Sequence, residues 1–161
     1  MATNYSPKIV TNGLVLSLDA ADKTSYPGSG TTWTDISGNG NHFTLYNSPT
    51  YNSDGYFTFD GVNQYGRSTN QIDLSSTNAV TVDVVFKVAS VTTNEMIFEH
   101  TATWNSNDGA FGVFTNSNGG LASSPTTDND MHMNSEGGRL DANVSDLTSF
   151  SINTFIFKSC L

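Results

Sequence analysis

The sequence predicts an all-β protein, built as a sandwich or a barrel. Short apolar segments alternate with turn signals rich in Asn, Ser, Asp and Gly, and no window sustains helical periodicity. Only 13% of the residues are charged. Asn, Thr, Ser and Gly therefore supply most of the polarity, and these residues favour strands and turns over helices. At 161 residues, we expect one hydrophobic core and one domain.

The clearest predicted strand covers residues 80–88, where Val80, Val82, Val84, Phe86 and Val88 alternate with Thr81, Asp83, Val85 and Lys87. This period of two predicts one core face and one wet face. Residues 14–18 are apolar on both faces and predict a buried strand. Further strands are predicted at residues 43–46, 56–59, 96–98, 111–114, 131–133 and 150–157.

Charge and cysteine content exclude several classes of function. Six Lys and Arg residues stand against 15 Asp and Glu residues, for a net charge of −9, so we expect no nucleic-acid partner. No apolar run approaches the length of a membrane span, and residues 1–10 lack a signal-peptide pattern, so we expect neither membrane insertion nor self-export. The single cysteine, Cys160, permits no intrachain disulfide and suits no zinc cluster.

Three segments together carry a family resemblance. Residues 6–21 read SPKIVTNGLVLSLDAA, residues 25–41 read SYPGSGTTWTDISGNGN, and residues 59–65 read FDGVNQY. The pattern Trp-x-Asp-x-Ser-Gly-Asn-Gly-Asn, followed at this separation by Phe-Asp-Gly-x-x-x-Tyr, resembles the opening of laminin-G-like domains in phage virion proteins. Such domains belong to the concanavalin A-like lectin/glucanase superfamily.

The resemblance implies a jelly-roll sandwich of two antiparallel sheets. We expect residues 1–12 to be an N-terminal segment and residues 13–161 to form the laminin-G-like domain. Members of the family usually continue with a further hairpin, so we expect the sandwich to be incomplete at its C-terminal end. The apolar strand near that end either lies inside a sheet or is covered by a partner or a missing segment.

Two sets of residues are candidate binding sites. Related sandwich domains often bind calcium, and Asp35, Asn39 and Asp60 lie in turns that resemble family segments; the alternative is that these side chains cap their own backbone. For sugar binding, the loop at Trp104, Asn105 and Asp108 combines an aromatic face with short polar groups, although such a loop can simply connect strands. Trp33 is interpreted as a core anchor rather than a sugar platform.

The sequence offers little for catalysis. A glycosidase needs two carboxylates about the scissile bond. Glu95 and Glu99 are expected on one face of a strand but about 13 Å apart, too far for either mechanism. His42, His100 and His132 lie in separate segments without metal-ligand spacing. We therefore expect no enzymatic activity.

Two functions remain open at this point. The first is a phage virion structural protein on the particle surface, as capsid decoration, head fibre or tail fibre, assembled in the host cytoplasm. Its partners would be other virion subunits in a homo-oligomer and glycans of the host surface, for host adhesion. The alternative is a carbohydrate-binding or glycoside-hydrolase-like module of a secreted bacterial protein.

Overall fold

The computed structural model describes residues 10–74, 77, 79–88, 95–100, 111–116, 130–135, 138–143 and 151–158. Within these residues every element is a β-strand and every pairing is antiparallel, which confirms the predicted all-β class. The strands are β1 (Thr32–Trp33), β2 (Phe43–Tyr46), β3 (Thr50–Asn52), β4 (Tyr56–Thr58), β5 (Tyr65–Ser68), β6 (Ala79–Phe86), β7 (Glu95–His100), β8 (Phe111–Asn116), β9 (Asp130–Ser135), β10 (Gly138–Asn143) and β11 (Ser151–Lys158). Among the same residues, no helix has the length and apolar character needed to cross a membrane.

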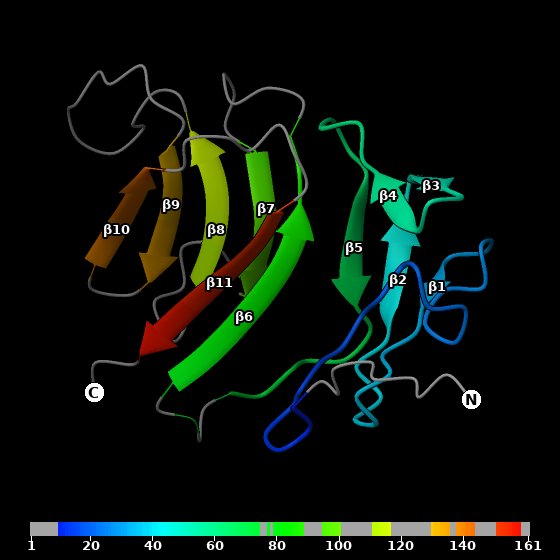
Figure 1. The fold of residues 1–161 in the computed structure, drawn as a ribbon, viewed down its shortest axis with the longest axis horizontal. Helices are drawn as coiled ribbons and strands as arrows, with labels where there is room; N and C mark the ends of the chain where they lie inside the picture. Colours follow the sequence, from blue (N-terminus) through cyan, green and yellow to red (C-terminus); the bar gives the residue numbers. More distant parts are fainter. Residues whose placement is uncertain are drawn as a thin grey trace, which may run out of the picture. The chain divides into compact units, whose positions relative to one another are not determined.

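The chain divides into two compact units, Met1–Asp73 and Leu74–Leu161, which we call unit 1 and unit 2. The predicted single sandwich over residues 13–161 stays a prediction. In unit 1, strands β1, β2 and β5 form a sheet in the order β1-β2-β5, while β3 and β4 form a hairpin (Figure 1).

The sheet of unit 1 has an inner and an outer face. Leu45, in the central strand β2, is only 4% exposed, whereas its neighbour Tyr46 is 40% exposed. Gly66 of β5 lies opposite Leu45, and a Cβ at this position would come within 3.4 Å of the Phe43 ring. This is an ordinary van der Waals distance, so the inner side chains of β2 pack directly on β5 at Gly66.

An aromatic cluster forms the core beside this sheet. Phe57 of β4 lies at its centre, with its ring centroid 4.7 Å from Tyr26, 4.8 Å from Trp33 and 5.5 Å from Tyr51. The tilted and edge-on geometries are those that aromatic pairs prefer. Trp33 is half-buried and packs edge-on against Phe57, which agrees with its interpretation as an anchor.

The predicted strand at residues 14–18 is wrong. This segment belongs to no sheet in the structure. Several of its backbone groups instead bond to the loop at residues 35–41: Ile36 N donates to Ser17 O at 2.9 Å. Side chains of that loop bond to Ser17 N, Leu14 O and Val15 O. Apolar composition predicted an extended chain, but side chains replace the neighbouring strand that would have made it a β-strand.

In unit 2, β7 to β10 form one sheet in the order β10-β9-β8-β7, and β6 pairs with β11 (Figure 1). Strand β6 alternates between exposed and half-buried residues along its whole length, which confirms the predicted period of two. Val113 of β8 is fully buried and Val88 is 7% exposed. The C-terminal strand β11 pairs with β6 from Ser151 to Lys158 and so lies in a sheet along that edge.

Candidate functional site

The carboxylate of Asp35 is the centre of the best-organised loop in unit 1. Its Oδ1 accepts hydrogen bonds from the backbone N–H groups of Ser17 and Ser37, both at 2.9 Å. Its Oδ2 accepts from Ser37 Oγ at 2.8 Å and from Asn41 N at 2.9 Å. Asp35 is 5% exposed. These four donors match the roughly four lone-pair sites of a carboxylate. The carboxylate therefore joins the backbone at Ser17 to the loop at residues 35–41.

Two asparagines extend this junction, which we call the Asp35 hub. Asn39 Nδ2 donates to Leu14 O at 2.8 Å, and Asn41 Nδ2 donates to Val15 O at 3.0 Å. Gly38 and Gly40 have φ angles of 93° and 74°, a region that glycine enters without strain. The Ser-Gly-Asn-Gly-Asn sequence is therefore used to turn the chain and to bond the segment that precedes it.

The hub lowers the pKa of Asp35. Burial alone would raise the pKa of this carboxyl, but the hydrogen bonds from Ser17, Ser37 and Asn41 favour the ionised form and outweigh it. The carboxylate remains charged although it is buried, because the surrounding N–H and O–H groups replace its water shell. His42 Nδ1 accepts from Asp35 N at 3.1 Å, so this histidine is also part of the local structure.

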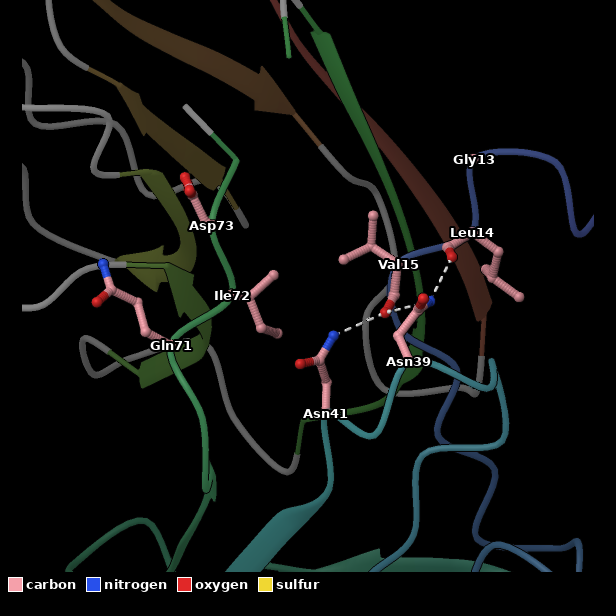
Figure 2. A pocket seen from close by; sticks show the side chains of 8 residues that line it. All are labelled: Gly13, Leu14, Val15, Asn39, Asn41, Gln71, Ile72 and Asp73. Carbon is pink, nitrogen blue, oxygen red and sulfur yellow. Dashed lines mark hydrogen bonds between the residues drawn. The ribbon is translucent and has the colours of Figure 1, made fainter. Parts of the chain in front are cut away.

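A shallow hollow of about 260 Å³ lies beside the hub. In Figure 2, Val15 and Asn39 lie along one side, Gln71 and Asp73 along the other, and the amide nitrogen of Asn41 points toward the Val15 carbonyl. The residues that line it are Gly13, Leu14, Val15, Asn39, Asn41, Gln71, Ile72 and Asp73. Asp73 is the single ionisable group in this lining, so the hollow does not provide the pair of carboxylates that glycoside hydrolysis needs.

Asp60 organises a different loop of unit 1. Its Oδ1 accepts from Val62 N at 2.9 Å, Asn63 N at 3.2 Å and Gln64 N at 3.3 Å. These backbone bonds, that of Val62 foremost, lower the pKa of the exposed carboxyl. The Asp60 side chain therefore caps its own turn, and its hydrogen bonds do not connect it to Asp35 or Asn39.

The three residues predicted to bind calcium do not fit a calcium site in this arrangement. Calcium needs six to eight oxygen ligands directed at one point, whereas the oxygens of Asp35 are taken by four protein donors and Asp60 belongs to another loop. The described residues contain no group of three or more His, Cys, Asp or Glu side chains that could hold a metal ion. Calcium binding at Asp35, Asn39 and Asp60, which the sequence predicted, is tested directly by the measurement below.

We expect neither EDTA nor millimolar calcium to change the stability of the protein, because a ligand stabilises only when it binds the native state. The measurement is the urea midpoint of the whole chain with EDTA and with added calcium. A calcium-dependent rise in this midpoint that disappears in Asp60→Ala would instead establish an ion site at the Asp60 loop.

The predicted sugar-binding residues Trp104, Asn105 and Asp108 lie outside the residues that the structure describes. The expectation for the two glutamates of β7 is wrong in one respect. Glu95 pairs with Thr115 and Glu99 with Gly112, and the register shifts between Met96 and Phe98. Because Thr115 and Gly112 are three residues apart, the two glutamate positions fall on opposite faces of the sheet.

One feature of unit 1 was not predicted from the sequence. Tyr46 of β2 and Tyr65 of β5 are paired in register, and their rings stack with centroids 4.7 Å apart and planes 16° apart. Both remain about half exposed, at 40% and 46%. Tyr65 stands in the quoted Phe-Asp-Gly-x-x-x-Tyr motif, but nothing in the sequence indicates that Tyr46 is its partner.

Comparisons of the chain with protein-family models, curated proteins and solved structures give no match.

Proposed function

We propose that this chain is a non-enzymatic structural protein of a phage virion, displayed on the capsid or tail as a decoration, head fibre or tail fibre. In this proposal it folds as a jelly-roll sandwich of the lectin-like kind and contacts other virion subunits and host glycans. The observation that carries the proposal is the Asp35 hub, in which the residues of the resemblance motif hold two segments of backbone together.

The hub supports the proposal because it gives the motif residues a structural role that involves no catalysis. Asp35 accepts four hydrogen bonds and is buried, so no free carboxylate faces a substrate there. The two segments that it joins, residues 14–17 and 35–41, lie within the first two segments of the resemblance, residues 6–21 and 25–41. A motif used in this way indicates a shared scaffold, and a scaffold without a carboxylate pair suits binding or display.

Particle composition tests this proposal. We expect the full chain in gradient-purified particles of the phage that encodes it, in a fixed ratio to the major capsid protein, as measured by quantitative mass spectrometry. A non-structural protein from the same genome serves as the control that should be lost on purification. Complete absence of the chain from intact particles would overturn the proposal.

A hydrolysis assay tests the non-enzymatic part. We expect the full chain to release no reducing ends from bacterial surface polysaccharides, because the positions of Glu95 and Glu99 fall on opposite faces of the sheet and the lining of the hollow includes a single carboxylate, that of Asp73. Cleavage that is lost in Glu99→Gln but kept in Glu136→Gln would support the secreted hydrolase-like module instead.

A further inference from the structure

The outer face of the β1-β2-β5 sheet carries an exposed aromatic pair beside a cation. Tyr46 and Tyr65 stack on each other across β2 and β5, and Arg67 lies two residues beyond Tyr65, on the same face and opposite Thr44. The burial pattern of β5 agrees, with Tyr65 and Arg67 exposed and the residues between and beyond them half-buried. We call these residues the tyrosine face.

The polar groups of this face are not used within the part of the chain that the structure describes. There, neither phenol hydroxyl makes a hydrogen bond, and Arg67 makes no ion pair. Tyr46 is 40% exposed and Tyr65 is 46% exposed, so a ligand can reach both rings.

Two turns hold the tyrosines in place. Gln64, next to Tyr65, donates from Nε2 to Asn47 O at 3.1 Å and to Ser48 O at 3.2 Å, and Asn47 Nδ2 donates to Asn63 O. Asn47 and Ser48 adopt φ angles of 58° and 57°, which non-glycine residues rarely keep unless their surroundings fix them. The aromatic pair is thus pre-organised, which reduces the entropy lost on binding.

We propose that the tyrosine face binds an acidic glycan, one whose pyranose rings carry a carboxylate. A tyrosine ring offers a flat apolar surface to the C–H face of a sugar, and the phenol hydroxyls and the Thr44 hydroxyl can bond sugar hydroxyls. Arg67 is a planar fork of donors that matches a carboxylate. Two residues of strand separate it from Tyr65 by about 7 Å, a distance that a sugar ring and the arginine side chain can bridge.

Charge favours this occupant over a second copy of the chain. The sequence holds only six Lys and Arg residues against 15 Asp and Glu residues, yet the outer positions of the three strands, Thr32, Thr44, Tyr46, Tyr65 and Arg67, include one cation and no carboxylate. Two copies of a chain with net charge −9 repel each other far more strongly than the chain repels a ligand with a single carboxylate, because the repulsion scales with the product of the two charges. A single sugar carboxylate placed on Arg67 finds local attraction instead. This inference names the ligand class for the host-glycan contact and in that respect rests on the proposed function.

Binding of the full chain to a glycan array tests the inference. The array carries oligosaccharides with uronic and sialic acids beside their carboxyl-reduced, neutral counterparts. We expect binding to one or more acidic members, weakened at least tenfold by carboxyl reduction. Tyr46→Ala, Tyr65→Ala and Arg67→Ala should each weaken it about tenfold, whereas Tyr46→Phe should keep most of the stacking.

Matched controls separate binding from folding and from net charge. Lys87→Ala removes one cation in unit 2, and Val62→Ala shortens an apolar side chain that is 83% exposed. Both variants should bind as the unchanged chain does. Circular dichroism of each variant checks its fold. Equal binding of acidic and neutral glycans, no binding at all, or a change of oligomeric state in the tyrosine variants without glycan binding would each overturn the inference.

The two proposals fail separately. A chain found in purified particles that binds no glycan leaves the virion assignment intact and removes the tyrosine face as a site. If the chain is absent from particles but binds a glycan, and the tyrosine and Arg67 variants lose that binding, the glycan site stands and the virion assignment falls.

Discussion

Replacing Asp35 with alanine should destabilise the protein by about 3 kcal/mol, because the change leaves up to four hydrogen-bond donors without an acceptor in a buried loop. Asp35→Asn should cost about half as much. Its side-chain oxygen can still accept from Ser17 and Ser37 N–H, but its NH₂ group would face the N–H of Asn41. Urea unfolding followed by near-ultraviolet circular dichroism measures both values. Amide exchange at Ser17 and Asn41 should accelerate in both variants.

Asp60→Ala is the matched control, since Asp60 also accepts several backbone bonds but is exposed. Its effect should be much smaller than that of Asp35→Ala. If the two substitutions destabilise the protein equally, the burial of Asp35 does not increase the stability that its hydrogen bonds provide.

The hub also predicts a dependence of stability on pH. The pKa of Asp35 is lower in the folded state than its ordinary value, because hydrogen bonding outweighs burial. Its contribution is therefore present above the ordinary pKa of aspartate, about 3.9, and is lost as the pH falls through the lower, folded pKa. Hydrogen bonds that Thr24 donates to Asp22 likewise lower the pKa of the Asp22 carboxyl, so only part of the acid sensitivity should disappear in Asp35→Asn. An acid limb of the stability curve that is unchanged in this variant would contradict the prediction.

Gly55→Ala should cost about 3 kcal/mol for two separate reasons. Gly55 closes the three-residue loop between β3 and β4 with a φ angle of 86°, where a Cβ adds about 1 kcal/mol. The new Cβ would also lie 2.6 Å from Ala21 Cβ and 2.8 Å from Ala21 Cα. The second contact is with backbone, so the chain itself must move, and overpacking of this kind costs about 1–3 kcal/mol. The same urea experiment measures the loss.

Gly13→Ala separates the two contributions. Gly13 has a φ angle of 77°, but a Cβ there meets no atom within 4 Å, so only the conformational cost of about 1 kcal/mol applies. Adding Ala21→Gly to Gly55→Ala should recover part of the loss, because it removes the closer contact and leaves the Cα. Equal effects of Gly13→Ala and Gly55→Ala would show that Ala21 moves aside freely.

Local pattern was enough to predict most of the longer strands. Alternation over residues 80–88 and the apolar runs at 43–46 and 111–114 correspond to β6, β2 and β8. The short strands β1, β3, β5 and β10 were not predicted, because they contain Thr, Asn, Gly and Arg and owe their strand character to a neighbour. Residues 14–18 failed for the opposite reason. Their composition suits a strand, but the side chains of Asp35, Asn39 and Asn41 bond to three of the backbone groups that a neighbouring strand would use.

The sites were predictable only in part. The motif pointed to Asp35 and Asn39, and hydrogen bonding of short side chains to nearby backbone was the alternative that the structure supports. Tyr46 and Tyr65 could not be paired in advance, because the register of β2 against β5 depends on contacts between distant segments. The positions of Glu95 and Glu99 fall on opposite faces because the register shifts between Met96 and Phe98, and this shift cannot be predicted from the residue types alone.

The pairing of β6 with β11 has a consequence for how the chain is made. The hub and the β1-β2-β5 sheet use residues from the first 73 alone, so all their hydrogen-bonding partners are synthesised before unit 2. Strand β6 is synthesised next, but its first residue, Ala79, pairs with Lys158, which is synthesised much later. Synthesis proceeds at about 5–20 residues per second. The valines of β6 are therefore exposed for several seconds before β11, the strand that pairs with β6, has been synthesised. Translation speed between these strands should therefore control how much protein escapes aggregation.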